Sequence, residues 1–115
     1  MGIFDLFGRN KKQDPDAGVL VQLRKNGSNL SKQHAVEFFL YFPTQAIAEQ
    51  AVQQIRQSGF HVQVMPGATD ENWLCFATKE MLPDLLSLQK IRTEFESLSK
   101  SLGGDYDGWG TPIVP

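Results

Sequence analysis

Alternating hydrophobic and polar positions predict three β-strands, over residues 35–42, 60–65 and 72–78. The first stretch is rich in β-branched and aromatic residues and ends at Pro43, which is typical of a central strand. The second and third are separated by a polar turn and are therefore expected to form a hairpin. If Glu37 faces solvent, the period of two divides the first strand into a core face with Val36, Phe38, Leu40 and Phe42, and a second face with Phe39 and Tyr41.

Apolar residues at intervals of three and four positions predict three helices. A short helix is expected over residues 17–25, with Asp16 as its N-terminal cap. The second helix begins after the cap Thr44, and its apolar stripe consists of Ile47, Ala48, Ala51, Val52 and Ile55. The third has Pro83 in its first turn and stops at residues 103–104, and its stripe consists of Leu85, Leu88, Ile91, Phe95, Leu98 and Leu102.

A last short edge strand is expected within residues 105–114, where Tyr106 and Trp109 stand. The predicted order is therefore a leading helix followed by strand, helix, strand, strand, helix and strand. With right-handed crossovers, this order folds into a four-stranded antiparallel sheet with two helices on one face. The sequence thus predicts an α+β sandwich of the ferredoxin-like kind, with an extra N-terminal helix.

The second face of such a sheet carries no helix of the repeating unit and is expected to be apolar. The alternation places the following side chains on this free face: Phe39, Tyr41, His61, Met65, Trp73 and Cys75. A surface of this kind is too apolar to face water without a reason. Two explanations stay open: the leading helix covers the face through Val19, Leu20 and Leu23, or a protein partner covers it.

The composition is that of one folded domain, with 41% hydrophobic and 21% charged residues in 115 positions. We expect a single domain over residues 16–115, preceded by a flexible or amphipathic segment over residues 1–15. The net charge of −2 lacks the basic footprint of a general nucleic-acid binder, so nucleic acid is an unlikely partner. A single cysteine and the lack of an apolar run of about 18–20 residues or of a signal-peptide pattern predict a cytoplasmic protein.

Residues 1–12 place four apolar side chains before three basic ones: Ile3, Phe4, Leu6 and Phe7, then Arg9, Lys11 and Lys12. One interpretation is a short anchor at an anionic membrane surface. The other is a frayed terminus with some apolar residues against the domain. The first interpretation makes a membrane-apposed adaptor one alternative function.

No catalytic motif is present: the sequence contains no G-x-S-x-G, no P-loop, no H-E-x-x-H and no pair of cysteines. Asp105 and Asp107 suggest the start of a calcium loop, but the further acidic ligands of such a loop are missing. Cys75 has no neighbouring cation or helix start that would activate its thiol, and we expect it to be a small buried side chain. The expectation is a protein without catalysis, metal or cofactor.

A ferredoxin-like sheet that displays aromatic side chains is also how RNA-recognition domains stack bases. Their central-strand pattern needs a basic residue and a glycine, and residues 72–77 contain neither. A single-stranded RNA-binding module therefore remains a second alternative. It predicts RNA retardation that falls when Phe39 or Trp73 is changed.

The heptapeptide Asp105-Tyr-Asp-Gly-Trp-Gly-Thr111 is the most specific motif of the chain. Together with the loop 26–29, the strand 36–40, the helix end 57–60 and the strand 73–78, it resembles the RraB family, regulators of ribonuclease E activity. The resemblance extends over about residues 19–111. It implies a ferredoxin-like sandwich preceded by a helix, no catalysis, and inhibition of a ribonuclease E-like endoribonuclease by direct protein contact.

Candidate partner-binding residues come from this motif and from the free face: Asp105, Tyr106, Asp107, Trp109, Phe39, Tyr41 and Trp73. Tryptophan and tyrosine are enriched at the energetic centres of interfaces, which favours a contact role for Trp109. Gly108 and Gly110 around it favour instead a tight backbone path that buries the indole. Both roles stay open at this point.

Overall fold

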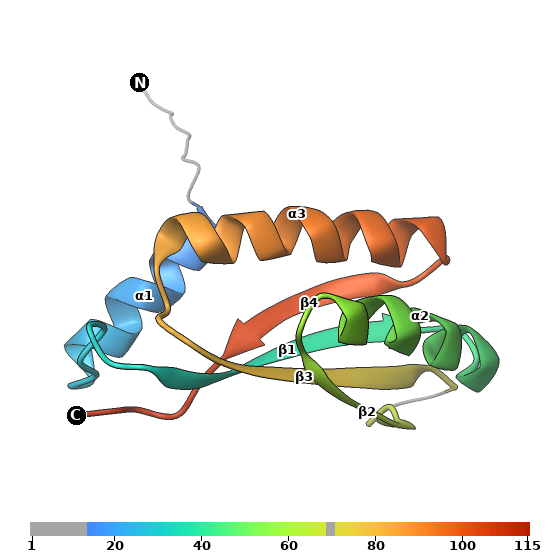
Figure 1. Cartoon of the computed structure of the whole chain (residues 1–115), viewed down its shortest axis with the longest axis horizontal. Coiled ribbons are helices and arrows are strands. Elements are labelled where there is room, and N and C mark those ends of the chain that lie inside the picture. The colour runs from blue at the N-terminus through green and yellow to red at the C-terminus, as the bar shows by residue number, and fades with distance from the viewer. Residues whose placement is uncertain (1–13, 69–70) are drawn as a thin grey trace.

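The computed structural model describes residues 14–68 and 71–115, which form three helices and four strands (Figure 1). The elements in chain order are α1 (Pro15–Lys25), β1 (His34–Phe42), α2 (Gln45–Gln57), β2 (His61–Pro66), β3 (Trp73–Met81), α3 (Leu85–Ser101) and β4 (Asp105–Gly110). Their order and types are those that the sequence predicts. The prediction of a membrane anchor over residues 1–12 lies outside the described residues.

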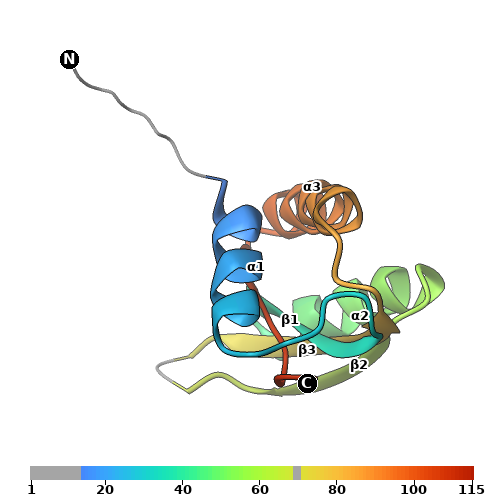
Figure 2. The ribbon, with the colours of Figure 1, turned by 90° about the vertical axis from the view of Figure 1, so that its left-hand side faces the viewer.

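The four strands form one sheet in the order β2-β3-β1-β4, and every neighbouring pair is antiparallel. α2 packs on β2 and β3, whereas α3 packs on β4 and β1. Both helices lie on the same side of the sheet (Figures 1 and 2). The predicted α+β sandwich with a ferredoxin-like strand order is confirmed. Within the described residues, no helix is both long and apolar enough to cross a membrane.

The core forms around the central strand β1, whose alternation follows the prediction. Val36, Phe38, Leu40 and Phe42 are buried beneath the two helices, while Phe39 and Tyr41 are half-buried on the other face. The Phe38 ring meets the rings of Phe60 and Phe95 edge-on, with centroids 5.5 and 5.6 Å away. Such aromatic pairs add about 0.5–1.5 kcal/mol each beyond the burial of their area.

The prediction for two side chains of β3 is wrong. Trp73 pairs with Phe42 and Cys75 pairs with Leu40, so both point towards the helices and not to the free face. Their places on the free face are taken by Leu74 and Phe76. The physical reason is that residues 73–77 are apolar at every position, so no polar residue indicates which side faces water.

α1 begins two residues earlier than predicted, and its cap is Asp14 and not Asp16. Asp14 is the cap, because its side chain accepts hydrogen bonds from the backbone N–H groups of Asp16 (2.9 Å) and Ala17 (3.4 Å). Pro15 follows as the first helical residue, where its missing N–H costs nothing. Asp16 itself is buried and is available for another role.

The caps of the other two helices follow simple rules. Thr44 caps α2 as predicted, with its hydroxyl oxygen accepting from the N–H of Ile47 at 3.1 Å. α3 begins later than predicted, because Pro83 lies before the helix and Asp84 is the cap, accepting from the N–H of Ser87 at 2.9 Å. The hydrogen bonds that Asp84 accepts from the N–H and the hydroxyl of Ser87 lower the pKa of its carboxyl.

α1 stands beside α3, on the side of the sheet that α3 covers (Figure 2). Leu23 joins the buried core there, and Val19 and Leu20 pack against it. Of the two explanations for the free face, covering by α1 is therefore wrong. Phe39 and Tyr41 lie on the opposite side of the sheet.

Gly104, in the connection between α3 and β4, lies very close to the end of β1. A Cβ atom at this position would overlap the carbonyl oxygen of Tyr41 and lie 2.6 Å from Cδ1 of Phe42. Gly104→Ala should therefore lower the free energy of unfolding by about 2–3 kcal/mol. In the control, Gly18→Ala within α1, the new Cβ meets no atom within 4 Å, and up to about 1 kcal/mol should be gained. Urea denaturation measures both, and equal stabilities of the two variants would contradict the close approach.

Candidate functional site

The side of the sheet away from α2 and α3 is here called the open face. The strand register shows which side chains lie on it, because residues paired on neighbouring strands point to the same side. By that register it comprises Ala35, Glu37, Phe39, Tyr41, His61, Gln63, Met65, Leu74, Phe76, Thr78, Glu80, Asp105, Gly108 and Gly110. Phe39 lies opposite Phe76 with ring centroids 5.5 Å apart, and Tyr41 lies opposite Leu74. With Met65, these half-buried side chains form an apolar strip across three strands.

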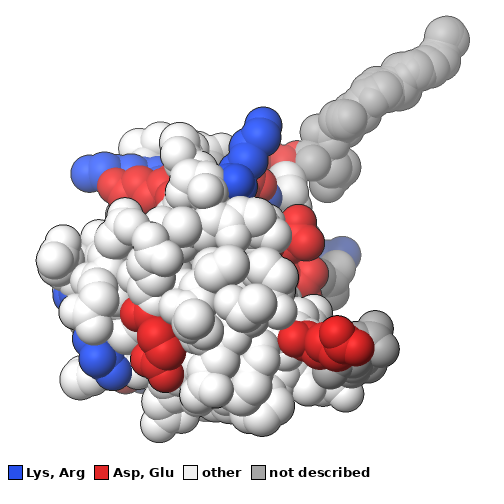
Figure 3. All heavy atoms as spheres, turned by 90° about the vertical axis from the view of Figure 1, so that its right-hand side faces the viewer, with Lys and Arg blue, Asp and Glu red and all other residues white. Residues whose placement is uncertain are grey.

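The charges on the open face have one sign. Its charged side chains are Glu37, Glu80 and Asp105, and among the described residues it has no lysine or arginine. Lys79, next to Glu80, points to the helix side, where its Nζ lies 4.9 Å from the centre of the Phe60 ring. The end of the molecule seen in Figure 3 likewise shows scattered charges around a broad uncharged surface, without a basic patch. The open face is therefore apolar with acidic residues around it.

Only some of the candidate partner-binding residues predicted from the sequence lie on the open face. Phe39, Tyr41 and Asp105 lie on it, with Asp105 opposite Tyr41. Trp73 lies on the helix side beside Phe42. Leu74 and Phe76 also lie on the open face, although the sequence pattern did not predict them there, and their pairing with Tyr41 and Phe39 of β1 identifies them.

The motif residues Tyr106 and Trp109 share the helix side although three positions separate them. Tyr106 lies opposite Leu40 and Gly108 lies opposite Phe39, so Asp107 is an extra residue in the ladder. Gly108 has a φ of +108°, a value that glycine adopts without strain. This β-bulge reverses the alternation and turns Trp109 towards the helices, where it is 9% exposed.

The buried indole belongs to a polar cluster of Asp16, Arg92 and Trp109, here called the α1 clasp. The fully buried carboxylate of Asp16 accepts from Trp109 Nε1 at 3.0 Å and from Arg92 Nε and Nη2 at 2.8 and 2.7 Å. The hydrogen bond to Asp16 raises the pKa of the Arg92 guanidinium above its usual range. The guanidinium also lies 6.0 Å over the ring of Tyr106. The clasp joins α1, α3 and β4, and it provides a hydrogen-bond acceptor for the N–H group of the buried indole.

Two groups with potential nucleophiles are enclosed. Cys75 donates from Sγ to the carbonyl oxygen of Ala48 at 3.4 Å, and burial raises the pKa of its thiol to about 12. Ser28 Oγ lies 2.6 Å from Nε2 of His34, whose Nδ1 lies 2.8 Å from the carbonyl oxygen of Lys32. This hydrogen-bond pattern assigns the proton to Nδ1.

The Ser28–His34 pair resembles a catalytic dyad in its contacts, but it connects the loop before β1 to the C-terminal residues. Both residues are buried, and Ser28 Oγ also accepts from the N–H of Val114 at 3.0 Å. The C-terminal residues are thereby tied to the loop before β1, where Asn29 donates to the carbonyl oxygen of Val114 at 2.6 Å. Within residues 14–68 and 71–115, no group of three His, Cys, Asp or Glu could hold a metal ion.

The α1 clasp predicts a stability effect. Asp16→Ala leaves the Arg92 guanidinium and the indole N–H without their buried acceptor, so the free energy of unfolding should fall by about 2–3 kcal/mol. The control Glu96→Ala removes an exposed partner of Arg92 at 3.2 Å and should cost less than about 0.5 kcal/mol. Urea denaturation gives the free energies, and hydrogen exchange should report faster opening of α1 in Asp16→Ala. Equal effects of both variants would argue against the clasp.

Cys75 predicts a reactivity effect. Because its pKa is raised to about 12, the thiolate is scarce at pH 8, and a disulfide reagent should react at least about 1000-fold more slowly with the native protein than with the urea-unfolded chain. The release of the chromophore from that reagent measures both rates. Rapid modification of the native protein at pH 8 would contradict the enclosed position of the thiol.

In a comparison with known families, the family model described as Regulator of ribonuclease activity B, RraB, matches residues 13–111. A comparison with curated proteins finds no match. The matched residues include all the helices and strands that the structure describes, as well as the open face and the α1 clasp. The chain therefore belongs to the RraB family, whose members regulate ribonuclease activity.

Proposed function

We propose that this protein is a non-catalytic regulator that inhibits a ribonuclease E-type endoribonuclease by direct contact, and that the open face is its contact surface. The observation that carries the proposal is the apolar strip around Phe39 and Phe76, which no helix of the described chain covers. Family membership supplies the regulation of a ribonuclease. The strip supplies a surface on which a protein partner can be bound.

The enclosed nucleophiles support binding over catalysis. Cys75 is buried with a raised pKa, and Ser28 and His34 are buried against the C-terminal residues. A general base must come within hydrogen-bond reach of a substrate proton, and the burial of these side chains favours a structural role for them. The proposed mechanism is therefore occupation of a segment of the nuclease, and we propose that it takes place in the cytoplasm.

The acidic residues of the open face support a protein partner over RNA. Single-stranded nucleic acids are bound by aromatic stacking together with cations along the phosphate backbone. Phe39 and Phe76 offer the stacking component, but the charges beside them are Glu37 and Asp105. A protein segment with apolar side chains and cationic flanks matches both parts of the surface.

The open face predicts a specific loss of nuclease binding. Phe39→Gln together with Phe76→Gln should weaken binding of the purified nuclease at least about tenfold, because burial of such aromatic side chains dominates many interfaces. Inhibition of RNA cleavage should fall in parallel. Val21→Gln is the matched control, since Val21 is 51% exposed on α1 and away from the sheet. Calorimetric titration measures the affinity.

Three outcomes separate the alternatives. Loss of binding in the double variant but not in the control supports the proposal. Unchanged nuclease binding in the folded double variant rejects the open face. Gel retardation of single-stranded RNA by the natural sequence, lost in the double variant, would instead indicate the RNA-binding alternative.

A further inference from the structure

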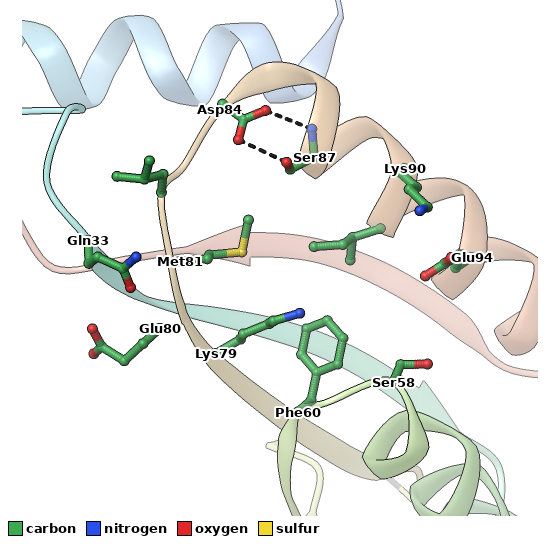
Figure 4. Close-up of a pocket in the computed structure, with 12 residues that line it drawn as sticks. Gln33, Ser58, Phe60, Lys79, Glu80, Met81, Asp84, Ser87, Lys90 and Glu94 are labelled. Atoms are coloured by element: carbon green, nitrogen blue, oxygen red, sulfur yellow. Dashed lines mark hydrogen bonds between the residues drawn. The ribbon is translucent and has the colours of Figure 1, made fainter.

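A groove of about 650 Å³ lies on the helix side of the sheet, between the first half of α3 and the end of β3 (Figure 4). Phe60, Met81 and Ile91 contribute apolar atoms to it, and Lys79 and Lys90 line its polar sides. It exists because α2 ends at Gln57, while β3 continues to Met81 without a helix above its last residues. A second hollow of about 250 Å³ continues it between α2 and α3, and both are lined by Ser58 and Glu94. The two together are here called the α3 groove.

A projecting apolar side chain lies next to this groove. Leu86, in the first turn of α3, is 79% exposed, and Leu82, which lines the groove, is 45% exposed. Removing a leucine side chain from water is worth about 1.5–3 kcal/mol. The same face therefore presents both a leucine that water solvates poorly and a hollow that accepts one.

The charged side chains that line the α3 groove are of both signs: Lys79 and Lys90 on one hand, and Glu80, Asp84 and Glu94 on the other. Lys90 and Glu94 lie one helical turn apart on its edge, and among the described residues neither forms an ion pair. Asp84 is already used as the cap that accepts from Ser87 N and Oγ, at 2.9 and 2.8 Å. A strongly cationic or anionic partner would gain little binding energy from a surface with charges of both signs. A second copy of the same surface, turned antiparallel, would place its Glu94 against Lys90 and its Lys90 against Glu94.

We propose that the α3 groove docks a second copy of this chain, with the two α3 helices antiparallel around a two-fold axis. The axis is level with residue 92 along the helix and passes on the side of Lys90 and Glu94, opposite to the side from which Arg92 reaches α1. A two-fold axis places positions equally far from it opposite each other. Lys90 then faces the partner's Glu94, because both are two positions from residue 92. Leu86 faces the partner's Leu98 and enters the hollow between α2 and α3, because both are six positions from residue 92. One register therefore satisfies the charges and the apolar contact together.

This dimer is independent of the proposed nuclease contact. The α3 groove lies on the helix side of the sheet and reaches the open face only at Glu80, at the end of β3, so a dimer leaves the apolar strip around Phe39 and Phe76 of both copies accessible. Loss of dimerisation and loss of nuclease binding are therefore separate results, measured on separate variants.

Sedimentation equilibrium of the full chain, from about 1 μM to 1 mM at low salt, tests the proposal and should give a monomer–dimer equilibrium. Leu86→Glu should raise the dimer Kd at least about tenfold, since it moves a charge against Leu98 of the other copy. Val21→Glu on α1 is the matched control for an exposed apolar position and should leave the Kd unchanged. Circular dichroism verifies that each variant is folded.

Charge reversal tests the register. Lys90→Glu and Glu94→Lys, each alone, place like charges opposite each other twice per dimer and should each raise the Kd about tenfold. The combined variant restores opposite charges and should return the Kd to within about threefold of the natural sequence. A protein that stays monomeric throughout, a dimer unaffected by Leu86→Glu, or a combined variant without recovery would each overturn the proposal.

Discussion

The alternation along β1 is the constraint on which the rest of this structure depends. From Val36 to Phe42, one side of the strand is apolar and lies under α2 and α3, so the other side, with Phe39 and Tyr41, has to face away from the helices. β3 and β4 then take their registers from this strand. A slip of one residue would exchange the two faces, and the buried apolar set makes such a slip costly. The core and the open face thus have the same origin in one strand.

A second constraint is the buried carboxylate of Asp16, which has to be paired because an isolated charge in the interior is strongly unfavourable. Its partners Arg92 and Trp109 come from α3 and β4, so pairing the charge also fixes the place of α1. The heptapeptide that carries the family resemblance therefore contributes its tryptophan to the interior. The bulge at Asp107 is what brings the indole to the carboxylate.

Local patterns predict the elements of this chain well, because each has its own signal, such as the cap Thr44 before α2. Local patterns fail where neighbouring residues do not differ in polarity, or where a contact joins residues far apart in the sequence. Residues 73–77 are apolar throughout, so only the pairing with β1 shows that Phe76 and not Cys75 lies on the open face. The α1 clasp joins groups 76 and 93 positions apart, a contact that no local pattern contains. Four of the six side chains that the sequence places on the free face thus lie on the open face, whereas the clasp is not predictable from the sequence.

The edges of the sheet have a consequence for its solubility. An added strand on β4 would lose its ladder at the extra residue Asp107, because a bulge interrupts the regular spacing of N–H and C=O groups. On the other edge, β2 ends at Pro66, which has no N–H, and Arg56 donates to the carbonyl oxygen of Val62 at 3.2 Å. Both edges are therefore poor templates for pairing with another chain, so an apolar sheet face can stay in solution without growing into an aggregate.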